Sequence, residues 1–210
     1  CQGETHLAHL ANPGRLAELL TPERTLWVRS VDDPHRKTKY DLMLVEIDHT
    51  LVSIDSQLPN RLMDRALINR TLPELQDIRE IDREVTRGHS RIDFTVEDSG
   101  GVIWIEVKSV TLVIGDTARF PDAPTKRGTR HLRDLREAVL DGERAEVYFV
   151  IQREDAEAFA PNDRTDPDFA AALRKAADVG VGVHALRCRV KQQHVHLWTE
   201  VPVYLDAPIS

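Results

Sequence analysis

The first quarter of the chain alternates apolar and polar residues in the way that is typical of strands. Three such segments precede the first clear break, at residues 25–31, 41–48 and 50–55. A short helix is expected upstream of them, because Asn12 can cap its start and Pro13 suits a first turn. Leu16, Leu19 and Leu20 would form its apolar stripe. The pattern predicts a small module dominated by strands.

The pattern changes after Pro59, where apolar positions take the longer period of helices. Helices are predicted from Asn60, as a cap, to Arg70, over 129–140, and from Asp166 to Asp178. Strands are predicted over residues 78–85, 90–96, 102–107, 144–151, 181–190 and 195–203. The order αβββαβαββ predicts an α/β (α+β) domain over 59–210, behind a β module over 1–58.

The charge of the chain is unevenly distributed. The formal net charge of the 210 residues is −7, which by itself argues against a nucleic-acid partner. Residues 119–136, however, hold six Lys or Arg and two Asp, a local charge of +4. No apolar run approaches the ~18 residues of a membrane helix, and two cysteines cannot build a disulfide framework. We therefore expect a cytoplasmic protein without a membrane partner, in which anions bind locally.

Residues 90–107 predict a hairpin with a chemically unusual face. With 98–101 as the loop, Asp93 lies opposite Glu106 and Arg91 opposite Lys108, while the other face is apolar throughout. Like charges that face each other across strands destabilise a sheet. A divalent cation between the carboxylates and a phosphate beside the two bases would remove both conflicts. This favours metal-assisted phosphodiester hydrolysis. The alternative is a solvated sheet face with diagonal ion pairs.

The spacing of Asp93 and Glu106-Val107-Lys108 resembles that of the PD-(D/E)xK nuclease superfamily, although Ile92 stands where its name has proline. More closely, nearly the whole chain resembles the sugar fermentation stimulation protein family of bacteria and archaea. The matching stretches are Asn12-Pro13-Gly14-Arg15, Leu58-Pro59-Asn60-Arg61-Leu62, Ser90-Arg91-Ile92-Asp93-Phe94, Glu106-Val107-Lys108-Ser109-Val110-Thr111-Leu112, Phe120-Pro121-Asp122-Ala123-Pro124-Thr125, Arg127-Gly128-Thr129-Arg130-His131-Leu132, Gln152-Arg153-Glu154-Asp155 and Pro161-Asn162-Asp163.

The resemblance implies an N-terminal OB-like β-barrel module over 1–58 and a restriction-endonuclease-like domain over 59–210 with a central mixed sheet flanked by helices. Family members have more residues before Cys1, so the first barrel strands are expected to be missing. The implied function is a Mg²⁺- or Mn²⁺-dependent deoxyribonuclease that acts on single- or double-stranded DNA with little sequence preference, and a homodimer is allowed. The alternative is a non-catalytic DNA-binding regulator of sugar (maltose) metabolism.

The resemblance assigns roles by position. Asp93 and Glu106, with the Val107 carbonyl, would bind the metal, and Lys108 would serve as the catalytic base. Accessory catalytic positions are Glu84 and Gln152, each of which could equally be a simple strand-end polar residue. Candidate nucleic-acid contacts come from a basic loop, the hairpin and a helix start, where the backbone also favours anions. They are Arg36, Lys37, Lys39, Arg91, Arg127, Arg130 and His131, and for the hairpin and helix residues the alternative is a solvated face.

Overall fold

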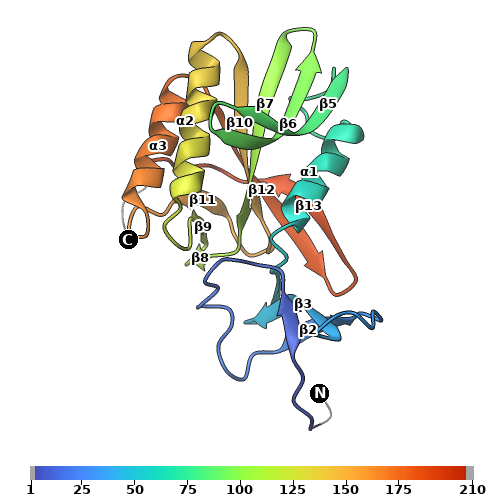
Figure 1. Cartoon of the computed structure of the whole chain (residues 1–210). Helices are drawn as coiled ribbons and strands as arrows, with labels where there is room; N and C mark the ends of the chain where they lie inside the picture. Colours follow the sequence, from blue (N-terminus) through green and yellow to red (C-terminus); the bar gives the residue numbers. More distant parts are fainter. Residues whose placement is uncertain (1–2, 207–210) are drawn as a thin grey trace.

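A computed structural model describes residues 3–206, so that Cys1 lies outside the described residues. A small β region lies below a larger α/β region, in which a sheet is covered on both faces (Figure 1). No helix within residues 3–206 has the length and apolar character needed to cross a membrane.

The small region is a four-stranded sheet built around one long strand, β3. β3 pairs antiparallel with β2 and β4 and parallel with β1. The bounds are β1 Ala8–Leu10, β2 Leu26–Ser30, β3 Tyr40–Ile47 and β4 Thr50–Ser53. The three strands predicted from the alternation are confirmed, whereas β1 was not predicted. Within the described residues, the strand pairs of this sheet do not close into a barrel.

The short helix predicted after Asn12 is wrong. The chain forms a single turn there, in which Leu19 N and Leu20 N both donate to Leu16 O. Leu16 has a φ of 46°, outside the helical region, and Asn12 Oδ1 accepts from Gly14 N at 2.8 Å instead of capping a helix. Leu16 and Leu19 are fully buried nonetheless. The spacing of the apolar residues therefore predicted correctly which side chains are buried, but it did not predict the backbone conformation.

The larger region is built on a six-stranded mixed sheet in the order β13-β12-β10-β7-β6-β5. β10 runs parallel to both β7 and β12, and the other neighbours are antiparallel. The bounds are β5 Glu80–Arg87, β6 Ser90–Asp98, β7 Gly101–Val110, β10 Arg144–Ile151, β12 Gly182–Lys191 and β13 His194–Glu200. All six predicted strands are confirmed, with ends that shift by up to three residues.

Three helices cover the large sheet, with α1 on one face and α2 and α3 on the other (Figure 1). Their bounds are α1 Leu58–Ile68, α2 Lys126–Leu140 and α3 Pro167–Asp178. Thr125 and Asp166 cap α2 and α3 by accepting from Gly128 N and Phe169 N. The α3 prediction is confirmed, and α2 begins three residues earlier than predicted.

The prediction that Asn60 caps α1 is wrong. The helix already begins at Leu58, because Pro59 fits its first turn, where no backbone N–H donor is needed. Asn60 therefore lies inside the helix, and its side chain is free to bind elsewhere.

A second small sheet, which was not predicted, lies under the ends of α2 and α3. It consists of β8 Val113–Ile114, β9 Thr117–Phe120 and β11 Ala158–Pro161, in the order β11-β9-β8. These strands are two to four residues long, too short to show a period.

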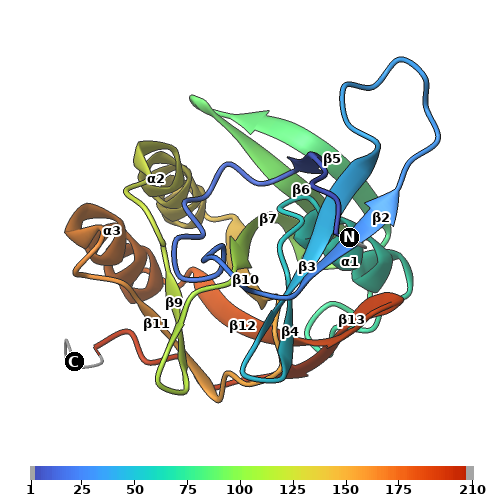
Figure 2. The ribbon, with the colours of Figure 1, turned by 90° about the horizontal axis from the view of Figure 1, so that it is seen from below.

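The two regions are packed together. Ser53 N at the end of β4 donates to Gln152 O at 2.9 Å, and Leu44 of β3 joins the hydrophobic core beneath α1. The segment between β1 and β2 lies beside β9 and the start of α2 (Figure 2). Arg15 N in that segment donates to Asp122 Oδ2 at 3.2 Å.

Candidate active site

The β6–β7 hairpin has the predicted register up to the point where the chemistry begins. Thr95 pairs with Trp104 and Phe94 with Ile105, and there the strand ladder ends. Beyond this point the side chain of Asp93 replaces a backbone acceptor: its Oδ2 accepts a hydrogen bond from Val107 N at 2.8 Å. The carboxylate is thus held between the two strands at the point where they separate.

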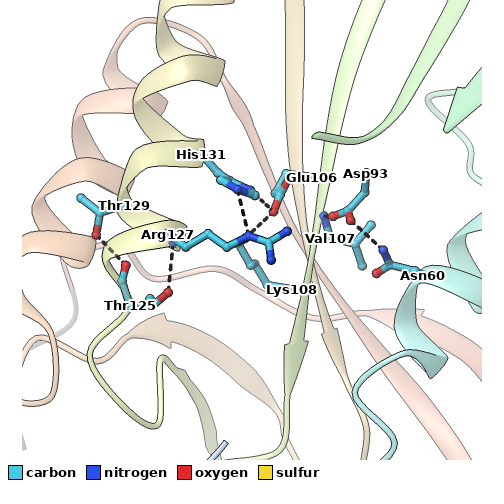
Figure 3. Close-up of polar contacts among 10 residues, drawn as sticks. Asn60, Asp93, Glu106, Val107, Lys108, Thr125, Arg127, Thr129 and His131 are labelled. Carbon is cyan, nitrogen blue, oxygen red and sulfur yellow. Dashed lines mark hydrogen bonds and ion pairs between the residues drawn. The ribbon is translucent and has the colours of Figure 1, made fainter. Parts of the chain in front are cut away.

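Asn60 holds the other oxygen of Asp93, a contact that the sequence did not reveal. Its Nδ2 donates to Asp93 Oδ1 at 2.7 Å from the first turns of α1 (Figure 3). The sequence pattern predicts that this amide caps a helix. The one sequence feature that marks Asn60 as functional is that it lies in the family-like stretch Leu58–Leu62. Because both oxygens of Asp93 are bound, the orientation of this carboxylate is fixed.

Glu106 is buried, with only 2% of its surface exposed, so the alternative of a solvated sheet face does not hold for this residue. Its Oε1 is bound by Lys108 Nζ and lies 2.5 Å from His131 Nδ1. Burial raises the pKa of Glu106, but Lys108 and His131 outweigh it and hold that pKa below its usual value. Its second oxygen, Oε2, is buried without a hydrogen-bond partner within residues 3–206.

His131 lies behind Glu106, although it was expected to contact phosphate. The ring is 2% exposed, and Arg127 Nε donates to His131 Nε2 at 3.3 Å (Figure 3). Since Nε2 accepts this bond, Nδ1 carries the proton and donates it to Glu106. Both ring nitrogens are therefore used inside the protein, and His131 orients the carboxylate from behind.

Asp93 and Glu106 disfavour each other's charge. Burial first, and then the negative charge of Glu106, raise the pKa of Asp93 to about 6, against the opposing effect of Lys108. A group with this pKa changes charge just below neutral pH. The site therefore holds one firmly ionised carboxylate next to one that is reluctant to ionise.

These side chains line an open cleft of about 630 Å³ between α1, the hairpin and the start of α2. Six residues predicted for the site meet there: Glu84, Asp93, Glu106, Val107, Lys108 and Arg127. Asn60, Arg61 and Ser56 complete much of the wall. The cleft thus brings together side chains from separate elements of the chain.

Glu84 enters the cleft through an unusual backbone conformation. Its φ is 56°, in the left-handed region that few non-glycine residues adopt. Its carboxylate pairs with Arg91 Nε at 2.7 Å, and both side chains are about half exposed. Arg91 is not among the residues that line the cleft, and its predicted pairing opposite Lys108 is absent because the β6–β7 ladder stops before it.

Other predicted residues lie outside the cleft. Gln152 is fully buried, with its Nε2 donating to Ser109 Oγ at 2.9 Å. In the small region, Arg36 is paired with Asp41, whose pKa its guanidinium lowers to about 2. Lys37 and Lys39 are exposed in the loop between β2 and β3. None of these four residues contributes to the cleft as it stands.

The outer face of α2 carries cations without partners. Arg130 is exposed, and it has neither a hydrogen bond nor an ion pair within the described part of the chain. The same holds for Lys126, Arg133 and Arg136. By contrast, the two arginines of β5, Arg83 and Arg87, both pair with carboxylates. The row on α2 begins beside the cleft, where Arg127 lies.

The donor set limits the kind of metal that the cleft could hold. Within residues 3–206, no group of three or more His, Cys, Asp or Glu side chains is placed to bind a metal ion together. The carboxylates that line the cleft are those of Asp93, Glu106 and Glu84, and Oε2 of Glu106 is unpartnered within the described residues. Val107, whose carbonyl is a predicted ligand, also lines the cleft. Such a set suits Mg²⁺ or a similar hard ion, which keeps several waters and takes phosphate oxygens as its other ligands.

Comparisons with known proteins agree over nearly the full length of the chain. Residues 1–54 match the SfsA N-terminal OB domain, and residues 57–194 match the sugar fermentation stimulation protein RE domain. A sugar fermentation stimulation protein homolog of Alkaliphilus metalliredigens is 45% identical over 200 residues, covering 94% of this chain and 86% of that protein. A homolog of Carboxydothermus hydrogenoformans is 46% identical, covering 97% of this chain and 89% of that protein.

A solved structure, that of Pyrococcus furiosus SfsA in complex with Ca²⁺, is similar with a TM-score of 0.88 and 31% identity. The match covers 97% of this chain and 87% of that one. Both the sequence and the architecture therefore agree, and the chain belongs to the sugar fermentation stimulation protein family.

Proposed function

We propose that this protein is a divalent-metal-dependent nuclease that hydrolyses phosphodiester bonds of DNA. The observation that carries the proposal is the pair of carboxylates of Asp93, half-buried, and Glu106, buried, held on adjacent strands in an open cleft beside Lys108. The two negative carboxylates repel each other, and one oxygen of Glu106 is buried without a partner among the described residues. Both features favour a cation between the carboxylates. The related Pyrococcus furiosus protein, solved in complex with Ca²⁺, supports a cation in this family.

In the proposed reaction, water adds its oxygen to phosphorus, one P–O bond breaks, and the leaving oxygen takes up a proton. A bound Mg²⁺ or Mn²⁺ would activate the water and offset the charge that develops on the phosphate. Asp93 and Glu106 hold that ion, and Asn60 and His131 keep the two carboxylates oriented. Lys108, an ion-pair partner of Glu106, directs its ammonium group at the water and the phosphate.

DNA reaches this site along cationic surfaces. Arg127 borders the cleft, and Lys126, Arg130 and Arg133 continue outward along α2 without partners in the described part of the chain that would compete for phosphate. A helix presents residues three and four positions apart on one face, so these cations form a row that can follow a phosphate backbone. The net charge of −7 over the whole chain makes binding depend on this row and on the cation.

The test is DNA cleavage by the whole protein with Mg²⁺ or Mn²⁺ and with EDTA. Glu106→Gln and Lys108→Met keep the side-chain size and are expected to lose at least about a hundred-fold in rate. Glu97→Gln, at an exposed acid of β6 outside the cleft, is the matched control and should cleave normally. Equal cleavage by Glu106→Gln and the unchanged protein contradicts the proposal.

A second function, DNA binding without catalysis by a regulator of sugar metabolism, is favoured by the same row on α2, because those contacts need no metal. It predicts salt-sensitive DNA binding in EDTA together with no metal-dependent cleavage under any condition. The cleavage and binding measurements separate the two functions.

A further inference from the structure

A second cavity adjoins the candidate active site. It has a volume of about 280 Å³ and lies between the segment that follows β1, the end of β7 and residues 120–125. Ser56 and Lys108 line both this cavity and the active-site cleft. Figure 2 shows the first of these segments crossing toward β9 and α2. A phosphodiester bound at Lys108 therefore has the cavity immediately on one side of it.

Apolar rings, one of them aromatic, form much of the cavity wall. They belong to Phe120 and to three prolines, Pro13, Pro121 and Pro124. The ring of Phe120 packs with Phe169 at a centroid distance of 5.0 Å, which fixes its orientation. The aromatic face of Phe120 can stack on any nucleobase, and the proline rings add apolar contact area.

The polar groups in the wall include two neutral hydroxyls that are partly unused, beside the charged side chains of Arg119 and Asp122. Thr111 is 6% exposed, and its hydroxyl makes no hydrogen bond within the described part of the chain. Ser109 accepts from Gln152 Nε2 at 2.9 Å and keeps its own hydroxyl proton to donate. Ligand pockets typically combine apolar walls with a few such groups, and they occur preferentially between domains. With Lys108 at the mouth, the set suits a nucleobase whose phosphate lies in the cleft.

Contacts between the two regions fix the size of the cavity. Arg15 N of the small region donates to Asp122 Oδ2 of the larger region at 3.2 Å, while Asn12 Nδ2 donates to Ile54 O within the small region at 2.8 Å. The approach at Gly14 is so close that a methyl group there would lie 2.9 Å from Asp122 Oδ2. A volume of 280 Å³ equals a cube about 6.5 Å on edge, whereas the major groove of a duplex alone is ~12 Å wide. One unpaired nucleotide can enter the cavity, but a duplex cannot.

We propose that this cavity binds one unpaired nucleotide next to the phosphodiester in the cleft, so that the substrate is single-stranded DNA or a strand end that has lost its pairing. The inference rests on the proposed function for the position of the phosphate. Duplex DNA has to give up stacking and pairing before a base can enter, whereas a single strand has already done so. The preference for single-stranded over duplex DNA is therefore set by the size of the cavity between the two regions.

The experiment measures binding without cleavage, so its outcome does not depend on turnover. Single-stranded oligonucleotides of about 12 residues, each with one 2-aminopurine at a different position, are titrated with the Glu106→Gln protein, and the fluorescence is followed. Binding is expected to change the emission strongly, because stacking alters 2-aminopurine fluorescence. A covalently closed duplex of the same sequence is expected to bind at least about ten-fold more weakly. Equal affinity for the closed duplex, or no change of emission at any position, overturns the proposal.

Two variants locate the effect. Ala123→Trp fills the cavity and should weaken single-strand binding about ten-fold, whereas Ala177→Trp, at a similarly half-exposed alanine near the far end of α3, should not. If Ala123→Trp does not fold, Thr111→Val is the second test, because it removes the free hydroxyl at nearly constant size. A several-fold weaker affinity is expected from it. Unchanged affinity in the folded cavity variant contradicts the nucleotide site, while loss of cleavage in Glu106→Gln separately tests the proposed nuclease.

Discussion

Replacing Asp93 by asparagine should stabilise the protein in the absence of metal. The pKa of Asp93 rises from 3.8 to about 6 on folding, so the native state disfavours its negative charge. The sign follows from linkage: a carboxyl group with a raised pKa stabilises the fold at low pH, and that contribution is lost as the pH rises through about 6. At ~1.4 kcal/mol for each pH unit, the ionised carboxylate costs ~3 kcal/mol at pH 8. Asparagine carries no such charge.

The substitution also keeps the local hydrogen bonds. The asparagine oxygen can still accept from Val107 N, and Asn60 can turn its amide to accept from the new NH₂ group. Asp93→Asn should therefore raise the free energy of unfolding by up to ~3 kcal/mol at pH 8 in EDTA, and by little at pH 4, where the carboxyl group is largely neutral in both states. Any stabilisation that the unchanged protein gains from added Mg²⁺ or Ca²⁺ should be lost.

Urea unfolding at pH 8 and pH 4 measures the effect. Asp98→Asn, on the same strand, is the control with the opposite sign, because Arg144 lowers the pKa of Asp98 and the charge there is favoured. The reasoning is refuted if Asp93→Asn is no more stable than the unchanged protein at pH 8, or if its gain is the same at both pH values.

Two further predictions concern surface charge and histidine. Arg130→Ala combined with Arg133→Ala should lower the slope of log affinity for DNA against log salt concentration by up to ~1.8, since each phosphate contact contributes ~0.9. Affinities measured from ~50 to ~200 mM salt check this. Arg24→Ala combined with Arg79→Ala makes the same charge change away from α2 and should leave the slope unchanged. Burial lowers the pKa of His184, but its two glutamate partners outweigh burial and raise it to about 9. The stabilisation should be complete below pH 6.5 and should be lost as the pH rises through about 9, so that the urea midpoint of His184→Gln falls less over that range than that of the unchanged protein.

The alternation of side chains along the chain is sufficient to predict most of the strands. The hairpin is the clearest example, because an apolar face that includes Ile92, Phe94 and Ile105 allows one register and no other. The prediction failed where local signals could be satisfied in two ways. Asn12 and Asn60 both looked like helix caps, and the first forms a turn while the second points to Asp93. The small sheet of β8, β9 and β11 joins a very short local hairpin, β8–β9, to the distant segment β11.

The site, like the fold, depended partly on local sequence and partly on tertiary packing. The sequence by itself placed Asp93 and Glu106-Val107-Lys108 on adjacent strands, because a period of two and a short loop leave little choice. Only the tertiary structure decided which groups surround them. It brought His131 behind Glu106 and Asn60 beside Asp93, and it enclosed the cavity next to Lys108 between two regions of the chain. Burial, pKa values and the shape of a cavity arise from packing between elements far apart in sequence, and no local pattern carries that information.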